Sequence, residues 1–461
     1  MKRINEYKLM GRSISQLVLP VLIEQFFIVI MGVVNTMLAS NLGPQAISAI
    51  GMVDSVSFIA ISIFSSLAVG GTVVVAQYTG RGDRDNANRA AAQALTSTIA
   101  IVITLTLILF ITQKPLLNTL YAEAEADVMQ NALSYMRIVI WSFLPLAVLS
   151  VAFGILRGAG DTKTPMQVSI TMNLLNLVLS YILIYGLKIN LGFISFRTTA
   201  YGIGGAAAGI TLARTAGMMI ILIPLLRGSR EIQLSDWKLF RLDLLMQKRI
   251  FLLGVPAGAE ALMFNGGKLI LQTFIVGLGT ASIAANAITN SVNALILIPG
   301  NAVVIAATTL VGQLVGKGEH IAARKHLKFL LMVACAAMLL LSIILLPLLG
   351  IIIGMYTDDT ATTVLAHRVL VSSLIAQPIL WAAAFILPGG LRGAGDVRYT
   401  MIVSIISMWV MRIILGYIFA VILPLGILGI WLAMYCDWIV RSTFFGLRMR
   451  GNKWLQKSII D

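Results

Sequence analysis

A small set of ionisable side chains lies inside otherwise apolar stretches of this chain. The acids are Glu24, Asp54, Glu260 and Asp437, and the bases are Arg137, Arg214, Lys268 and Arg412. A carboxylate in such a setting can take up and release a proton, ligate Na⁺ or attract a cationic compound. These residues are therefore the first candidates for chemistry, and the elements that carry them decide which chemistry is available.

The composition predicts an all-α polytopic membrane protein. Hydrophobic residues make up 58% of the 461, charged residues only 11%, and the mean hydropathy is +0.92. Soluble domains carry about a quarter charged residues, so this chain cannot cover a water-facing surface. Its longer apolar runs, such as 168–187 and 330–355, approach the ~20 residues that span a bilayer. A membrane β-barrel would show short alternating segments instead.

The formal net charge is +15, and the distribution of the basic residues along the chain indicates the membrane topology. Basic residues gather in the gaps between alternate apolar runs, which is the positive-inside pattern of a multi-pass protein of the cell (inner) membrane with both termini in the cytoplasm. No soluble basic segment exists, so nucleic acid is not an expected partner. Cys335 and Cys436 fall in apolar runs and suggest neither a disulfide nor a metal site. No phosphate-binding loop is present, so an ATP-driven engine is not expected.

The chain repeats itself. At a shift of 236 residues Pro20 and Glu24 meet Pro256 and Glu260, and at a shift of 235 the run 156–161 recurs as 391–396. The change of shift to 224 further on is absorbed by a longer loop, 188–201, in the first half. The turn residues shared by the halves are Gln77, Gly80, Arg157, Gly158 and Asp161, with their copies Gln313, Gly316, Arg392, Gly393 and Asp396.

The repeat predicts twelve transmembrane helices in two pseudo-symmetric six-helix bundles. We expect an N-lobe over 1–226, an interfacial linker over 227–249, a C-lobe over 250–447 and a cytoplasmic tail over 448–461. An even number of spans in each half keeps both halves in one orientation, so the repeat is parallel. The linker interleaves apolar and charged residues, which suits a short interfacial helix; a solvated linker is the alternative. Two such lobes suggest a cleft whose sites are exposed alternately as the lobes rock. The predicted helices cover 14–38, 46–78, 90–112, 128–155, 165–187 and 202–226, then 250–276, 282–315, 326–355, 363–390, 399–424 and 426–447.

Glu24 and Glu260 occupy equivalent points in the opening helices of the two halves, four residues after Pro20 and Pro256. Symmetry places them on opposite lobes facing a shared cavity, where each carboxylate could bind the coupling ion or a cationic substrate. The alternative is that both lie near the membrane surface and cap or snorkel.

The two halves also differ in their polar residues. Asp54 corresponds to Asn290, which fits ion chemistry in one lobe or a hydrogen bond between helices. Lys268 corresponds to Gly32 and could neutralise Glu260 or Asp54, or serve as a permanent counter-ion. Asp437 and Arg441, four residues apart, look like an ordinary ion pair close to the cytoplasmic surface.

These motifs together resemble the multidrug and toxic compound extrusion (MATE) family. The resemblance is carried by Pro20, by Val34-Asn35-Thr36, by Leu42-Gly43, by the Gln-x-x-Gly-x-Gly turns at 77–82 and 313–318, and by the two Leu-Arg-Gly-Ala-Gly-Asp turns. It covers essentially the whole chain. It implies two six-helix lobes and export of amphipathic, often cationic, compounds driven by inward movement of Na⁺ or H⁺.

One departure from the family pattern affects the ion site. Members commonly carry an aspartate where this chain has Asn35. An amide binds no proton at working pH, although its carbonyl oxygen can ligate Na⁺. We therefore expect Asp54, Glu24 or Glu260 to take over the ion chemistry, with any Na⁺ near Asn35, Asp54 or Glu260. The acid that some members carry in the tenth helix is also missing, because the surroundings of Trp381 are apolar.

The leading interpretation is a secondary-active multidrug efflux transporter that exchanges amphipathic or cationic compounds for Na⁺ or H⁺. It would work as a monomer among membrane lipids and need no cofactor. The alternative is a flippase for lipid-linked precursors, which should have a wider and more basic cavity. A membrane enzyme is disfavoured, because the sequence shows no convergent catalytic groups.

Overall fold

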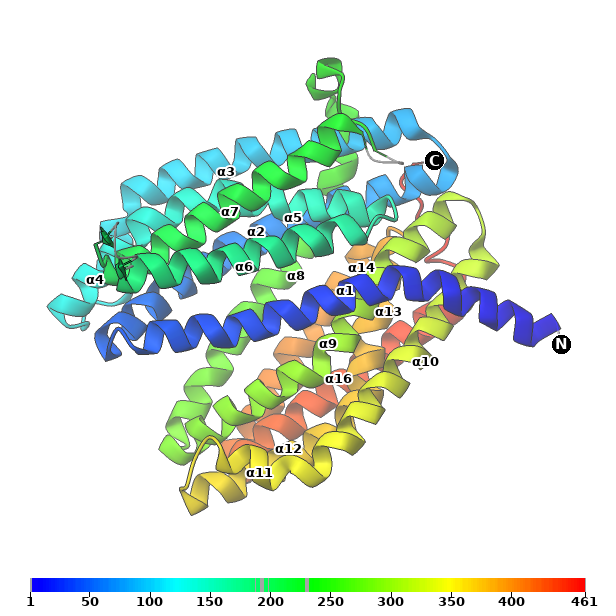
Figure 1. Cartoon of the computed structure of the whole chain (residues 1–461). Helices are drawn as coiled ribbons and strands as arrows, with labels where there is room; N and C mark the ends of the chain where they lie inside the picture. The colour runs from blue at the N-terminus through cyan, green and yellow to red at the C-terminus, as the bar shows by residue number, and fades with distance from the viewer. Residues whose placement is uncertain (1, 187, 191–194, 198, 229–231, 461) are drawn as a thin grey trace. The chain divides into compact units, whose positions relative to one another are not determined.

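The computed structural model describes residues 2–186, 188–190, 195–197, 199–228 and 232–460. Within these residues the chain is helical except for one two-stranded hairpin. Eleven helices are long and apolar enough to cross a membrane. The twelfth span, α16 (Gly426–Arg450), is less apolar because it carries Asp437 and Arg441. The prediction of an all-α membrane protein with twelve spans is confirmed (Figure 1).

Six spans make up each half, and most are longer than predicted because polar turns extend the helices beyond their apolar centres. The first half contains α1 (Lys2–Ser40), α2 (Pro44–Arg81), α3 (Arg84–Leu120), α4 (Ala126–Val139) continued by η1 (Ile140–Ser142) and α5 (Phe143–Gly158), α6 (Lys163–Tyr185) and α7 (Gly202–Arg227). The second half contains α8 (Leu244–Gly277), α9 (Thr280–Gly316), α10 (His320–Leu345) continued by η3 (Leu346–Leu348) and α11 (Leu349–Gly354), and α12 (Thr360–Ala376) continued by η4 (Gln377–Trp381) and α13 (Ala382–Gly393). It ends with α14 (Val397–Ile406), η5 (Ser407–Ile414), α15 (Leu415–Tyr417), η6 (Ile418–Ile422) and α16.

The described helices of the second half contain π-helical segments, whereas those of the first half do not. The segments η4, η5 and η6 are all π-helical, while the equivalent fifth span of the first half, α6, is a regular α-helix. Pro378 near the start of η4 removes one backbone donor, which explains the first of them. Such wide turns re-aim side chains and are frequent at functional sites.

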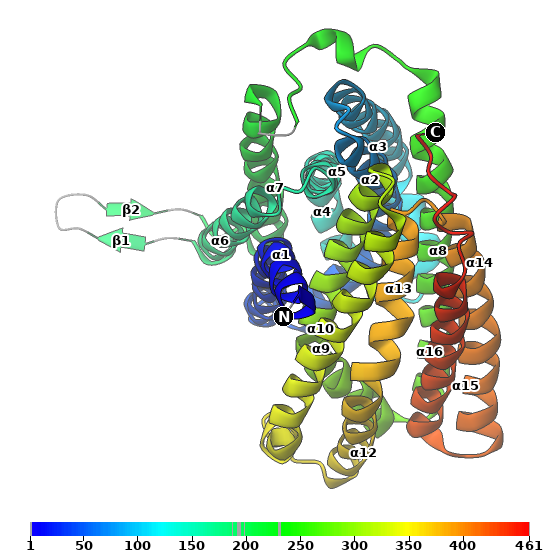
Figure 2. The same cartoon turned by 90° about the vertical axis from the view of Figure 1, so that its right-hand side faces the viewer.

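A small hairpin fills the loop in which the first half is longer. Strands β1 (Lys188–Asn190) and β2 (Ser195–Arg197) pair antiparallel, with Lys188 opposite Arg197. The hairpin follows α6 and extends away from the helices (Figure 2). The extra residues between the two spans therefore add a loop and leave α6 and α7 side by side.

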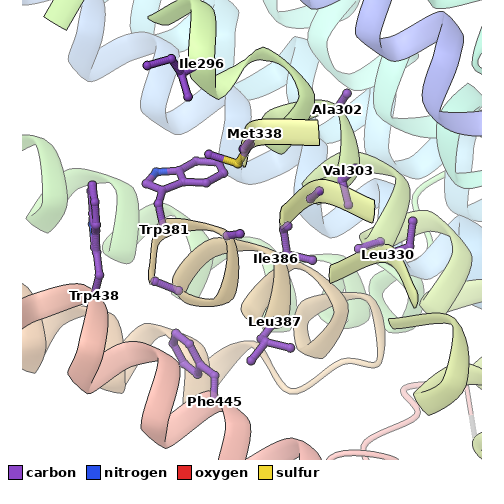
Figure 3. Close-up of a cluster of buried hydrophobic side chains, with 14 of the residues drawn as sticks. Ile296, Ala302, Val303, Leu330, Met338, Trp381, Ile386, Leu387, Trp438 and Phe445 are labelled. Atoms are coloured by element: carbon purple, nitrogen blue, oxygen red, sulfur yellow. The ribbon is translucent and has the colours of Figure 1, made fainter. Parts of the chain in front are cut away.

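The chain forms two compact units, each with its own core. The C-terminal unit contains Met1–Gln25, Ala76–Asp83 and Val255–Asp461, and the N-terminal unit contains Phe26–Val75 and Arg84–Gly254. In the N-terminal unit, the Phe64 and Phe143 rings meet edge to face with centroids 6.0 Å apart. In the C-terminal unit, the buried Trp381 indole lies against Met338 (Figure 3).

Close helix packing explains why the Gln-x-x-Gly-x-Gly turn occurs twice. A Cβ on Gly80 would lie 2.0 Å from the Gln313 carbonyl oxygen, and a Cβ on Gly316 would lie 2.0 Å from that of Gln77. The ends of α2 and α9 therefore cross backbone to backbone within the C-terminal unit, each through the glycine of its own turn. Only glycine permits this approach.

The two Leu-Arg-Gly-Ala-Gly-Asp turns share one backbone conformation, but their aspartates bind different partners. Gly160 and Gly395 both adopt φ +96°, where a residue with a side chain is strained. Asp161 then caps α6 by accepting a 3.0 Å hydrogen bond from the Thr164 amide. Asp396 instead accepts a 2.7 Å hydrogen bond from Arg448 Nε. The repeat thus preserves the turn while the two acids bind different partners.

The linker between the halves folds less regularly than the predicted interfacial helix. Its described residues contain one 3₁₀ turn, η2 (Trp237–Phe240), and Leu244 already begins α8. Ile232 is fully buried, whereas Trp237 is 83% exposed. Gln93 of α3 holds the segment by donating to the Arg241 carbonyl over 2.7 Å.

Candidate functional site

Each unit encloses a cavity lined by polar side chains. The N-terminal cavity measures about 460 Å³ and the C-terminal cavity about 420 Å³. Both lie within the range of about 300–1,000 Å³ that is typical of small-molecule sites. The polar residues of the N-terminal cavity are Asn35, Thr36, Asp54, Tyr135, Asn176, Ser180 and Arg214. Those of the C-terminal cavity are Lys268, Gln272, Asn286, Asn290, Asn293, Gln377 and Arg412, together with Trp381, Trp431 and Trp438.

A chain of hydrogen bonds fixes Asn35 in the N-terminal cavity. The Ser180 hydroxyl donates to Asn176 Oδ1 over 2.9 Å, and Asn176 Nδ2 donates to Asn35 Oδ1 over 3.3 Å. The Asn35 carbonyl oxygen thus keeps a lone pair for a further partner. The predicted Na⁺ ligand is held in place from α6.

Asp54 faces the same cavity and is the acidic residue among its described lining residues. Arg214, on α7, lies on the cavity wall and donates to the Ser142 hydroxyl over 2.7 Å. Among the described residues that line this cavity, Asp54 and Arg214 are the charged ones, so their formal charges cancel. The Asp54 carboxylate is open to the cavity and therefore available to a cation or a proton.

An aromatic wall bounds the C-terminal cavity. The Trp381 and Phe385 rings stack with centroids 4.7 Å apart, and Phe264 meets Phe385 edge to face at 6.4 Å. Gly300 of α9 makes room for the indole, because a Cβ there would lie 2.3 Å from Trp381 Cζ3. Flat apolar ligand groups can stack on such rings.

A buried charge network supports the other side of this cavity. Asp437 is fully buried and binds Arg441 Nε over 2.7 Å, and Arg412 Nε lies 3.7 Å from its second oxygen. The Ser407 hydroxyl also donates to Asp437. The expected i,i+4 pair of Asp437 and Arg441 is thus present, and it differs from an ordinary exposed ion pair because both side chains are at most 2% exposed within the protein.

Lys268 lies on the cavity wall two helical turns after Glu260. Its ammonium lies over the Phe264 ring, 4.9 Å from the centroid. Eight residues span about 12 Å of helix, so Lys268 and Glu260 stand at different depths of α8. In the described part of the chain Glu260 pairs instead with Arg392, 4.0 Å away in the second Leu-Arg-Gly-Ala-Gly-Asp turn.

The structure therefore separates the predicted site residues into three places. Asn35 and Asp54 line the N-terminal cavity, and Lys268 and Asn290 line the C-terminal cavity. Glu24 is 1% exposed and Glu260 is bound near the turn of Arg392, and neither is among the described residues that line these cavities.

The two cavities are built from equivalent positions. At a shift of 236 residues, which also relates the ends of the two repeats, Lys268 corresponds to Gly32, Asn290 to Asp54 and Arg412 to Asn176. At the shift of 224, Trp438 corresponds to Arg214. The repeat thus produces an equivalent cavity in each unit, and the side chains that line the two cavities differ in charge. This correspondence could have revealed Asn176, Arg214, Arg412 and Trp438 as wall residues, although only the two arginines stood out in the sequence.

Neither Gln377 nor Tyr135 was indicated as a cavity residue by the comparison of the two halves. Gln377 lies four residues before Trp381, in surroundings that the sequence suggested to be apolar, and it lines the C-terminal cavity from η4. Tyr135 lies between Ser134 and Arg137 in α4, a helix of mixed polarity, and lines the N-terminal cavity.

A comparison with known protein families finds the same internal repeat. The MatE family model matches residues 20–182 and again residues 256–418. An uncharacterized transporter of Bacillus subtilis, YisQ, is 26% identical over 453 residues, which cover 97% of this chain and 96% of that protein. A probable multidrug resistance protein NorM of Thermotoga maritima is 26% identical over 466 residues, covering 97% of this chain and 94% of that protein.

Solved structures share the fold over almost the whole length. The outward-facing conformation of a multidrug resistance MATE family transporter of the MOP superfamily superposes with a TM-score of 0.88 at 20% identity, with 97% of each chain covered. A MOP superfamily transporter from Pyrococcus furiosus, whose description states that reverse polarity of its binding pocket suggests a different function, gives 0.86 at 21% identity, also with 97% of each covered.

Proposed function

Because this chain belongs to the MatE family of membrane transporters, we propose that it exports amphipathic organic compounds in exchange for Na⁺ or H⁺. The observation that carries the proposal is the N-terminal cavity, in which Asp54 faces open space beside Arg214 and Asn35. Relatives named as multidrug resistance proteins support the substrate class. Both termini are proposed to lie in the cytoplasm and the chain to work as a monomer.

Asp54 is the proposed carrier of the coupling ion. Among the described residues lining the two cavities it is the one carboxylate. Asn35 cannot take up a proton, but its carbonyl oxygen can join Asp54 in ligating Na⁺. Either ion neutralises Asp54 and so weakens its attraction to Arg214 across the cavity. Two states of this pair, with and without the ion, give the N-terminal unit a switch that inward ion movement can drive.

Glu24 and Glu260 are proposed to act away from ion binding itself. Glu260 lies 4.0 Å from Arg392, and its Oε2 atom accepts no hydrogen bond. A loosely held pair at a turn can open and re-form as the surrounding helices move. Glu24 takes the equivalent position in the first half.

Flipping of lipid-linked precursors is the second candidate, and one observation favours it. The C-terminal cavity carries Lys268 and Arg412 on its wall, and a precursor lipid would present a phosphate group there. The expectation of cationic substrates comes from the family resemblance, whereas the bases on this cavity wall favour a negatively charged group.

Replacement of Asp54 by Asn tests the ion role. We expect Asp54→Asn to abolish ethidium efflux from cells while leaving the amount of protein in the membrane unchanged, because the amide cannot take up the coupling ion as the carboxylate does. Glu123→Gln removes the same charge from an exposed loop and should leave efflux intact. Full efflux by Asp54→Asn would remove Asp54 from the mechanism.

A further inference from the structure

The charges on the wall of the C-terminal cavity have one sign. Lys268 and Arg412 line it, and among the described lining residues none is a carboxylate. The acid nearest to Arg412 is Asp437, 3.7 Å from it, which is fully buried behind the wall. A ligand that enters this cavity therefore meets positive charge first.

Asp437 does not neutralise the bases around it. Its carboxylate is shared by Arg441 at 2.7 Å and by Arg412 at 3.7 Å, and it also accepts the Ser407 hydroxyl. The buried groups are thus two bases against one acid, a formal excess of one positive charge, and the exposed Lys268 on the same cavity wall adds a second. Buried charge without a counter-charge is costly, so an anion in the cavity would stabilise the network.

Hydrogen-bond donors on the wall lack partners. Arg412 is 5% exposed and Trp438 is 3% exposed, yet Arg412 Nε and Trp438 Nε1 make no hydrogen bond. Asn293 Nδ2 and Gln377 Oε1 are also unpartnered, which leaves one amide donor and one amide acceptor. Asp437 Oδ2, 3.7 Å from Arg412 Nε, also lacks a hydrogen bond, so three N–H donors stand against two oxygen acceptors. The surplus is one N–H group, which can donate to an oxyanion.

Lys268 completes the set from α8. Its ammonium lies over the face of Phe264, 4.9 Å from the centroid, which is a weak hold that an anion would replace. The partly exposed Phe264 and Phe385 rings line the same cavity and offer it an apolar surface, and the buried Trp381 is stacked behind Phe385. Charge and aromatic surface are thus joined in one cavity of about 420 Å³.

We propose that the C-terminal cavity binds amphipathic anions, in which a carboxylate, sulfonate or phosphate group meets Lys268 and Arg412 and a flat aromatic body lies against the partly exposed Phe264 and Phe385 rings. The proposal rests on the export function above and names the class of compound that the C-terminal cavity prefers. In the equivalent N-terminal cavity Asp54 offsets Arg214, so the anion preference belongs to the C-terminal cavity alone.

Three naphthalene compounds of the same shape test the charge preference. The protein, in nanodiscs of phosphatidylcholine, is titrated calorimetrically with naphthalene-2-sulfonate, with 2-naphthyltrimethylammonium and with neutral 2-naphthol. We expect the sulfonate to bind about tenfold or more tightly than the ammonium compound, with the naphthol between them. Tighter binding of the ammonium compound, or binding of none of the three, would overturn the proposal.

Variants of Lys268 test whether the sulfonate binds in the C-terminal cavity. We expect Lys268→Gln to raise the Kd of the sulfonate about tenfold and to leave that of 2-naphthol unchanged, whereas Lys268→Arg keeps sulfonate binding. Lys238→Gln removes the same charge from the exposed η2 turn and should change neither. An unchanged sulfonate Kd in Lys268→Gln would also overturn the proposal.

A second lipid separates a soluble anion from a lipid headgroup. Nanodiscs that contain phosphatidylglycerol supply a competing phosphate group. Weaker apparent binding of the sulfonate in them identifies a lipid phosphate as an occupant, and unchanged binding identifies soluble anions; both agree with an anion site. Failure of the anion preference would leave ion-coupled export standing, because export is tested separately through Asp54→Asn.

Discussion

Replacing Gly316 with alanine is a direct test of the helix crossing that joins the two copies of the Gln-x-x-Gly-x-Gly turn. The new Cβ would lie 2.0 Å from the Gln77 carbonyl oxygen, where an ordinary contact needs 3.4 Å or more. The two helix ends must therefore separate by about 1.4 Å, and the obstacle is backbone that no side-chain rotation removes. Overpacking of this kind costs about 1–3 kcal/mol.

Thermal unfolding followed by intrinsic tryptophan fluorescence measures this cost. For a unit of about 150–250 residues, 1 kcal/mol shifts Tm by about 2–4 °C, so we expect Gly316→Ala to lower Tm by about 2–12 °C. Gly446→Ala is the matched control, because a Cβ there meets nothing within 4 Å in the same unit. Alanine in a helix is favoured over glycine by about 0.5–1 kcal/mol, so the control should keep or raise Tm.

The symmetric substitution sharpens the test. Gly80→Ala creates the same 2.0 Å clash with Gln313 across the same crossing. Once the helices have separated, both methyl groups fit, so the double variant should lose less stability than the two single losses added together. A Tm for Gly316→Ala equal to that of the wild type would refute the backbone contact on which this reasoning depends.

Three further substitutions test the buried charges and the tail. Glu260→Gln should abolish ethidium efflux without lowering the amount of protein in the membrane, because Arg392 loses the acid 4.0 Å from it; full efflux would remove Glu260 from the mechanism. Asp437→Asn should lower unfolding stability by about 3–5 kcal/mol in a denaturant titration, since it leaves Arg441 buried without its counter-charge; an unchanged midpoint would contradict the network. Trp454→Ala should cost about 3–5 kcal/mol by the same assay, because Trp454 is fully buried; no loss would show that the tail packs elsewhere.

The sequence predicted the repeat and its turns because backbone constraints are visible in residue type. A close approach requires glycine at 80 and 316, and a left-handed turn requires glycine at 160 and 395. Such positions permit no other residue, so both copies retain them. The twelve spans were equally predictable from apolar length, with α16 the least apolar because of Asp437 and Arg441.

The walls of the cavities were harder to predict, for two physical reasons. Arg412 and Asp437 meet across η5 and α16, and no spacing in the sequence shows a contact between separate helices. The π-helical turns of η4 and η5 also change the face on which Gln377 and Arg412 lie, so a period of 3.6 misplaces them. Asp54 and Asn290 could be predicted by comparing the two halves of the sequence, because a difference in residue type at equivalent positions stands out.

Transport in proteoliposomes tests the central claim most directly. The purified protein is reconstituted, Na⁺ and H⁺ gradients are imposed one at a time, and the movement of ethidium and of naphthalene-2-sulfonate is followed by fluorescence. Export coupled through Asp54 predicts that one of the two gradients drives movement, that Asp54→Asn abolishes it, and that Glu123→Gln does not. If neither gradient moves either compound with the wild-type protein, the account of ion-coupled export is contradicted.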